Sequence, residues 1–252
     1  MAGLTLILNT AESHIQYALL EGGALLHSCS FLASKGGVEV LAPSLNDAFL
    51  RMHRSMDGIS RIACVAGPGN FTGLRIGLST AAALARVLGA RQAGLDYLQC
   101  LAANAPARPG EETLVLVKAR SGLAFSARFL TGADGVPRST HPARLLDTRQ
   151  ATRESLGSPA YVVGSGAELL PFPVPSLRDP LSTLPSVASL MLCAGLVDWD
   201  QAGCGDIAPV YLRDCDAVEN LGQISLSLGR DPEQAKTEFD RLTARPAGGA
   251  QP

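Results

Sequence analysis

The sequence predicts an α/β fold of two lobes, each a mixed β-sheet flanked by helices. Short apolar runs alternate with helical repeats in the first part of the chain, and a second set of apolar runs follows later. A polar, Pro- and Gly-rich stretch at 104–112 separates the two sets. We therefore predict lobes at 1–103 and 104–205, followed by an extension at 206–252. Aromatic residues are only 5% of the chain, so the core should be aliphatic.

Three strands are predicted at the start of the first lobe. The apolar runs at 4–8, 15–20 and 24–31 have the length of strands, and Glu21-Gly22-Gly23 is a turn signal between the last two. A helix from about Val38 to Met56 follows. Its evidence is the helical spacing of its apolar residues, which include Leu41, Leu45, Ala48 and Met52.

A further strand and helix complete this lobe. Residues 61–66 read as a strand, residues 67–73 as a glycine-rich turn, and residues 74–88 as a helix that Gly89 can end. The resulting order, β-β-β-α-β-α, is typical of an actin-like or ribonuclease-H-like half-domain, although the pattern alone is not unique to it.

The second lobe and the extension are less regular. Strands are predicted at 113–119, 123–131 and 160–163, and a helix at 186–199. In the extension, Asp231 can cap a helix that has Pro232 in its first turn and runs to about Leu242. Residues 245–252 are expected to be disordered.

The glycine-rich turn allows two interpretations. Its glycines permit unusual backbone angles and close approach, so it could hold a phosphate or carboxylate at the helix N-terminus, or it could be a tight structural turn. No P-loop pattern follows it. The candidate residues of this turn are Gly67, Pro68, Gly69, Phe71, Thr72, Gly73 and Arg75.

The helix at 74–88 is apolar nearly all round. Such a helix must be covered on most sides, either as a central core helix or by a sheet on one face and a partner chain on the other. Gly77, Ala81 and Ala85 form a small-residue row that would let another backbone come close.

No pattern in the chain predicts a catalytic or metal site. The four histidines are not spaced as a helical zinc-binding pair, and no GxSxG nucleophile motif occurs. Asn9 at the end of the first strand is expected to form an Asx turn, and Gly164-Ser165-Gly166 a plain glycine turn rather than a nucleophile site. We therefore predict no cofactor and no metal.

Composition also bears on location and on nucleic acid. Six cysteines without a CxxC pair suit a reducing cytoplasm, and the chain shows neither a signal peptide nor an apolar run of about 18 residues. The net charge is −2 with no visible basic cluster, so we do not expect the isolated chain to bind tRNA tightly.

One segment resembles a known family. The run GPGNFTGLRIGLSTAAALA at 67–85 is similar to the GPGSFTGLRIG segment of the TsaB family, also called YeaZ or Gcp-like. Weaker similarity follows in the expected order, at 6–20 (LILNTAESHIQYALL), 117–120 (VKAR), 163–167 (VGSGA) and 209–213 (PVYLR). The resemblance therefore spans about residues 4–213.

The resemblance implies a two-lobed actin-like fold and a non-catalytic subunit. Members of the family support threonylcarbamoyl transfer to an adenosine beside the tRNA anticodon. Catalysis there belongs to a TsaD-like paralogue, a TsaE-like ATPase completes the complex, and tRNA is met only through the complex. Asn9, Ala11 and Lys118 depart from the family pattern at the cleft, which puts any nucleotide role in doubt.

The resemblance also implies where the partner docks. The helices at 40–56 and 74–88 are expected to meet those of the paralogue, or of a second copy when the chain is alone. The predicted interface residues are Leu41, Leu45, Phe49, Met52, Leu74, Ile76, Gly77, Leu78, Ala81 and Ala85. The alternatives are a metalloprotease or phosphotransferase of the same superfamily, and a homodimeric structural protein.

Overall fold

The structure, a computed structural model, describes residues 3–33, 37–120, 122–157, 159–171, 183–212 and 221–243. The chain forms two compact units, Met1–Leu212 and Arg213–Pro252. The first unit holds both β-sheets and the second holds two helices. The boundaries 1–103, 104–205 and 206–252 drawn from the sequence stay a prediction, because both sheets lie within one compact unit.

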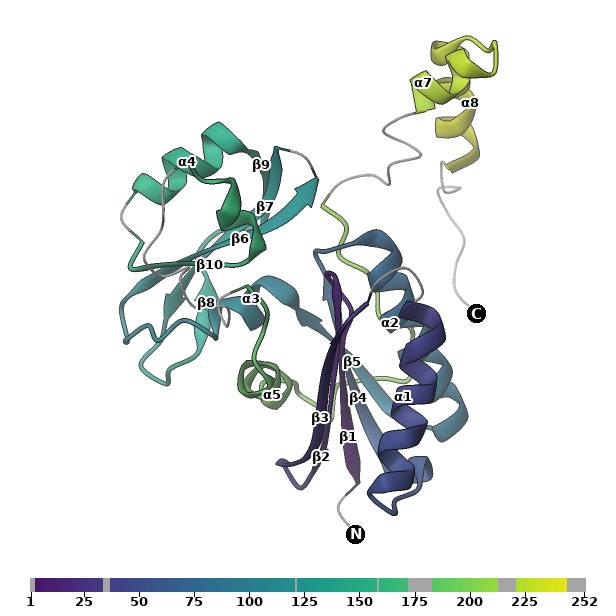
Figure 1. Ribbon diagram of the computed structural model, residues 1–252, viewed down its shortest axis with the longest axis vertical. Coiled ribbons are helices and arrows are strands. Elements are labelled where there is room, and N and C mark those ends of the chain that lie inside the picture. The colour runs from purple at the N-terminus through teal and green to yellow at the C-terminus, as the bar shows by residue number, and fades with distance from the viewer. Residues whose placement is uncertain are drawn as a thin grey trace. The chain divides into compact units, whose positions relative to one another are not determined.

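The first sheet has five strands within the described residues, in the order β3-β2-β1-β4-β5 (Figure 1). The first three strands form an antiparallel meander, and β4 and β5 continue parallel to β1. Gly22 and Gly23 both have positive φ, which suits the tight turn between β2 and β3. The strands are β1 (Leu4–Asn9), β2 (His14–Glu21), β3 (Ala24–Leu32), β4 (Ile59–Gly67) and β5 (Arg91–Asp96).

Helices cover both faces of this sheet (Figure 1). Leu6 and Leu8 of β1 pack in a cluster with α1 and α2, whereas Ile7 packs in a cluster with α3 and α5. This alternation follows from the two-residue period of a strand, and it makes β1 apolar on both sides. The helices are α1 (Gly37–Arg51), α2 (Phe71–Leu88), α3 (Tyr97–Ala102) and α5 (Val187–Gly195).

The second sheet has the order β10-β6-β7-β8, with β9 also paired to β7. Helix α4 (Thr148–Leu156) lies beside it and begins with a capping box, in which Asp147 and Gln150 satisfy each other's backbone N–H groups. The strands are β6 (Glu112–Arg120), β7 (Leu123–Thr131), β8 (Pro137–Ser139), β9 (Arg144–Asp147) and β10 (Tyr161–Val163). The predicted α/β class, with two mixed β-sheets flanked by helices, is thus confirmed.

One apolar cluster runs through both lobes. It joins Ile7 and Val65 of the first sheet to Val115 and Phe129 of the second. Residues of α3 and α5, including Leu98, lie in the same cluster. The two sheets therefore share a core, and α3 and α5 contribute to it.

Several predicted boundaries differ from the structure. The first helix ends at Arg51 instead of Met56, and Met56 begins the short 3₁₀ helix η1 (Met56–Gly58), which the Ser55 side chain caps. The helix expected at 186–199 ends at Gly195. The one expected to begin at Leu74 begins at Phe71, because Asn70 caps it.

The second unit contains α7 (Leu221–Ser227) and α8 (Pro232–Thr243), which pack against each other. As predicted, Pro232 is the first residue of α8, and the Asp231 carboxylate accepts the N–H of Glu233 at 2.9 Å. The disorder predicted for 245–252 falls outside the described residues.

Candidate docking face on helices α1 and α2

The glycine-rich turn carries α2 close to the turn between β1 and β2. A Cβ at Gly73 would lie 2.2 Å from the carbonyl oxygen of Thr10, and one at Gly69 would lie 2.4 Å from that of Ala11. These distances are too short for any side chain. The two glycines are therefore explained by backbone packing within the chain rather than by a ligand.

Three N–H groups in the first turn of α2 are already partnered. The Asn70 carboxamide oxygen accepts from Thr72 N at 3.0 Å and from Gly73 N at 3.1 Å, and Leu74 N donates to the Asn70 carbonyl. An anion at this helix terminus would have to displace the cap. Between the two interpretations of this turn, the geometry favours the structural one.

The predicted interface stays a prediction, but the structure shows how exposed each of its residues is in the single chain. Most of them are buried against the chain's own first sheet, so they present no surface to a partner: these are Leu41, Leu45, Phe49, Leu74, Gly77, Ala81 and Ala85. Met52, Ile76 and Leu78 are partly exposed. Helical periodicity finds the face of a helix that packs, and here that face packs onto the protein itself.

The outer faces of the same helices remain uncovered. Leu50 in the last turn of α1 is 65% exposed, and Val87 in the last turn of α2 is 82% exposed. Both helices follow strands that run parallel to each other, so their last turns lie at the same end of the sheet. Val40 of α1 is also exposed. We call the outer surface of α1 and α2 the docking face.

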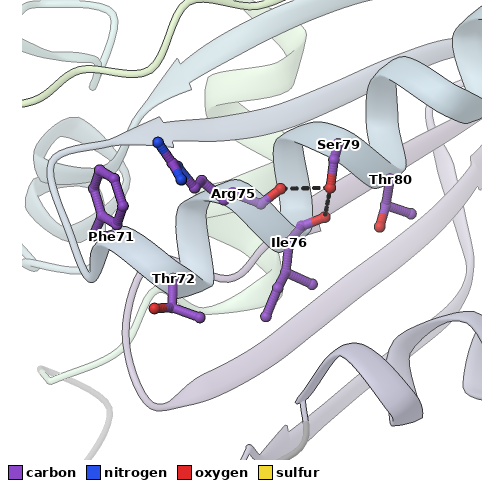
Figure 2. Close-up of a pocket in the computed structure, with 6 residues that line it drawn as sticks. All are labelled: Phe71, Thr72, Arg75, Ile76, Ser79 and Thr80. Carbon is purple, nitrogen blue, oxygen red and sulfur yellow. Dashed lines mark hydrogen bonds between the residues drawn. The ribbon is translucent and has the colours of Figure 1, made fainter.

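A pocket of about 310 Å³ opens on the docking face along the first half of α2. Figure 2 shows its lining: Phe71, Thr72, Arg75, Ile76, Ser79 and Thr80. The Arg75 guanidinium lies 4.0 Å from the centre of the Phe71 ring, a cation–π contact. Phe71 also packs on Tyr211, with ring centres 5.1 Å apart. The site thus combines an apolar floor with one cation.

Helix α2 is unusual for a helix on the outside of a sheet. Among the described helices it is the one with the length and hydropathy of a membrane span. Leu74, Gly77, Ala81 and Ala85 are buried in the fold, which identifies it as a packed helix of the domain. Apolar side chains that it leaves exposed, such as Val87, lie outside this buried row.

A polar cluster lies where the β1–β2 turn meets the second lobe. The Glu12 carboxylate accepts hydrogen bonds from the Tyr97 hydroxyl of α3 and from the Ser165 hydroxyl of η2 (Ser165–Leu169). Burial raises the pKa of Glu12, and these two hydrogen bonds oppose the rise. Ser165 also accepts the N–H of Lys118 at 3.1 Å. Its own proton is donated to Glu12, so Ser165 makes two hydrogen bonds in this cluster. The interpretation of Gly164-Ser165-Gly166 as a plain glycine turn stays a prediction.

Two other residue-level expectations can be compared with the structure. The Asn9 side-chain oxygen accepts the N–H of Ala11 at 3.1 Å, so Asn9 forms the expected Asx turn. Within the described ranges, no group of three or more His, Cys, Asp or Glu side chains is placed to hold a metal ion. Sequence reasoning missed Glu12, because its partners lie far away along the chain.

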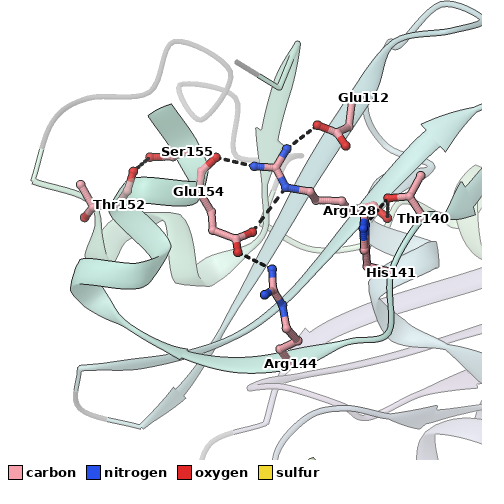
Figure 3. A network of polar contacts seen from close by, with 8 residues as sticks. All are labelled: Glu112, Arg128, Thr140, His141, Arg144, Thr152, Glu154 and Ser155. Atoms are coloured by element: carbon pink, nitrogen blue, oxygen red, sulfur yellow. Dashed lines mark hydrogen bonds and ion pairs between the residues drawn. The ribbon is translucent and has the colours of Figure 1, made fainter. Parts of the chain in front are cut away.

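An ion-pair network holds α4 to the second sheet (Figure 3). Arg128 of β7 pairs with Glu112 and with Glu154, and Arg144 also pairs with Glu154. Arg128 additionally donates to the Glu154 carbonyl at 2.6 Å. These partners of Arg128 all belong to the second lobe, which gives this network a structural role.

The chain is similar to known proteins in both sequence and fold. The TsaD family, described as tRNA N6-adenosine threonylcarbamoyltransferase, matches residues 31–152. The chain is 24% identical over 225 residues to the Escherichia coli tRNA threonylcarbamoyladenosine biosynthesis protein TsaB, covering 86% of this chain and 97% of that protein. A Pseudomonas aeruginosa structure described as similar to peptidase YeaZ is 25% identical, with a TM-score of 0.68, covering 84% of this chain and 100% of that one.

The chain is similar to TsaB in sequence and to YeaZ in fold. An uncharacterised Mycobacterium leprae protein is 32% identical to it over 197 residues, or 76% of this chain, but the chain spans only 50% of that protein's length. A tRNA N6-adenosine threonylcarbamoyltransferase of Rhizobium leguminosarum is 26% identical over 234 residues, 62% of its length. The similarity to both TsaB and the transferase confirms the resemblance seen in the sequence.

Proposed function

We propose that this TsaB-like chain is a non-catalytic dimerisation and activating subunit. It supports threonylcarbamoyl transfer to the adenosine next to the tRNA anticodon by docking a TsaD-like paralogue. A TsaE-like ATPase joins the same cytoplasmic complex, and tRNA is met only through the complex. When the paralogue is absent, the same face pairs two copies of the chain.

The observation that carries the proposal is the docking face. Helices α1 and α2 bury one side in their own sheet yet leave Leu50, Val87 and the pocket beside Phe71 uncovered. A paired-helix surface that combines exposed apolar side chains with an arginine has the composition of a protein interface. The transferase similarity of 31–152 covers both helices, so the paralogue should carry a matching pair.

The side chains at the family's cleft positions support the non-catalytic part of the proposal. Asn9 and Lys118 stand where the family pattern has aspartates, and the Asn9 side chain is engaged with Ala11 and Gln16. Ser165 is engaged with Glu12. These contacts hold the turn between β1 and β2 in place, and the two aspartates of the family pattern are missing from the cleft.

The test is binding of the TsaD-like paralogue from the same genome, measured by calorimetry. Leu50→Glu and Val87→Glu should each weaken binding roughly 10- to 150-fold, which corresponds to losing one buried apolar side chain worth about 1.5–3 kcal/mol. Both side chains are exposed in the monomer, so its melting temperature should stay within about 2 °C of the parent.

Leu196→Glu is the matched control. Leu196 is 48% exposed and follows α5, away from the docking face. It should bind like the parent. If Leu50→Glu and Val87→Glu also bind like the parent, the docking face is not the interface. Threonylcarbamoyl transfer by the purified chain, free of the paralogue, would contradict the non-catalytic assignment.

A further inference from the structure

Glu12 joins three parts of the chain that are distant in sequence. It lies in the turn between β1 and β2, and its two carboxylate oxygens accept from Tyr97 of α3 and Ser165 of η2. Ser165 is itself fixed by the N–H of Lys118 at 3.1 Å. Each hydroxyl has one proton and donates it in a hydrogen bond to Glu12, so the carboxylate is the centre of the cluster.

The same turn holds the start of α2. The carbonyl of Ala11, the residue before Glu12, accepts the N–H of Asn70 at 2.6 Å. Asn70 is the residue that caps α2. Gly69 and Gly73 pack so tightly on Ala11 and Thr10 that neither has room for a Cβ. The cap cannot shift without the turn shifting too, because the two backbones are in direct contact.

Beyond Asn70 lies the docking face. Phe71, the first residue of α2, and Arg75, one turn later, line its pocket. Gly67 is fitted as closely, since a Cβ there would lie 2.7 Å from the carbonyl oxygen of Val210. A continuous set of contacts thus leads from the Glu12 cluster to Phe71 and Arg75.

We propose that Glu12 is a latch that fixes the β1–β2 turn against the second lobe and thereby sets the position of the first turn of α2. When the latch is broken, the docking face loses its shape and binds its partner more weakly. This consequence for binding rests on the proposed function, but the effect on the first turn of α2 does not. Glu12 acts as a positioning residue and touches no partner.

The charge on Glu12 explains why both hydroxyls point at it. The ionised carboxylate is the stronger acceptor for both hydroxyls, because protonation turns one oxygen into a donor and removes the charge. Desolvation raises the pKa of Glu12, and the nearby Glu168 adds to the rise. Burial and then the Glu12 charge raise the pKa of Tyr97, so Tyr97 keeps its proton for the hydrogen bond. The latch therefore holds a partly buried charge in place by two donors.

Hydrogen exchange tests the latch without any partner. Tyr97→Phe and Ser165→Ala each delete one hydrogen bond to Glu12 and keep most of the packing. Both should speed amide exchange at Asn70 and Gly73 by at least about tenfold, as expected when a charge-assisted hydrogen bond is lost. Exchange within α4 should stay unchanged. Parent-like exchange at the cap in both variants overturns the latch.

Binding then tests the consequence. Glu12→Gln should weaken binding of the paralogue about five- to tenfold. Ser13→Ala is the matched control, because Ser13 is exposed in the same turn, and it should bind like the parent. Fast exchange at the cap with unchanged affinity overturns the link to docking. If the parent itself does not bind the paralogue, the proposed function fails, and the exchange result alone still decides the latch.

Discussion

Gly77 lies where α2 passes nearest to the end of β1, and alanine there should be tolerated only if Thr10 is shortened as well. A Cβ at Gly77 would lie 2.3 Å from the Thr10 hydroxyl oxygen, and the next contact, with the Cys64 sulfur, is an ordinary 3.4 Å. Thr10 is buried and branched at Cβ, so rotating it brings its methyl group toward the same space.

Two opposing effects set the size of the change. Alanine is preferred over glycine inside a helix by about 1 kcal/mol, whereas overpacking a core costs about 1–3 kcal/mol. Gly77→Ala should therefore range from neutral to about 2 kcal/mol less stable. The Thr10 hydroxyl has no hydrogen-bond partner among the described atoms, so Thr10→Ala alone should cost little.

The double variant separates the two effects. With Thr10→Ala in place the clash is gone, and Gly77→Ala should now stabilise the protein by about 1 kcal/mol. The coupling between the two sites is then about 1–3 kcal/mol, or roughly 2–12 °C in melting temperature for a chain of this size. Urea unfolding of the four proteins in the cycle measures it.

An alanine at Gly195 is the control, because a Cβ there meets nothing within 4 Å. It should be neutral or slightly stabilising. Additive effects at Gly77 and Thr10 would refute the close approach of α2 to β1. They would also remove the reason for small residues on that side of the helix.

Three further results are expected. Ala85→Leu should cost about 1–3 kcal/mol in urea unfolding, because Ala85 is buried against the sheet, and parent-like stability would contradict that placement. Arg128→Ala should cost about 1–3 kcal/mol, because it removes the Arg128 partner of Glu112 and leaves Glu154 paired with Arg144 alone. Asp134→Ala breaks an exposed pair and should leave the urea midpoint close to that of the parent. The pKa of Glu12 is raised above 4.5 in the folded state, so the folded protein holds this proton more tightly than the unfolded chain does. The stability of the parent relative to Glu12→Gln should therefore fall as the pH rises from about 4.5 through the raised pKa. A stability difference that stays flat or grows with pH would be evidence against a raised pKa.

The first half of the fold could be predicted because its elements are long and periodic. Strands β1, β2, β3 and β4 and helices α1 and α2 all carry apolar spacing of the right period. The prediction missed β5 and α3, since Arg91–Asp96 has only weak alternation and six residues are too few to show a helical period. For α4 a signal was present, because Asp147 followed three residues later by Gln150 is the pattern of a capping box. The helix was still missed, because its residues are mainly polar and show no apolar period.

The candidate site shows what periodicity can and cannot supply. The pattern located the two helices but selected Leu45, Ala81 and similar residues, which face the sheet. The exposed residues of a docking face have no period of their own, because nothing within the chain constrains them. Glu12 was out of reach for another reason, since Tyr97 and Ser165 meet it only through the tertiary fold.

The apolar cluster common to both lobes has a practical consequence. A fragment that ended at residue 103 would keep Leu98 and Leu101 of α3 but lose Val115 and Phe129, which lie in the same cluster. The severed surface would be apolar and prone to aggregate, so neither half should survive as a separate module. Split-reporter designs, proteolytic dissection and domain swaps between relatives must therefore treat Met1–Leu212 as an indivisible block.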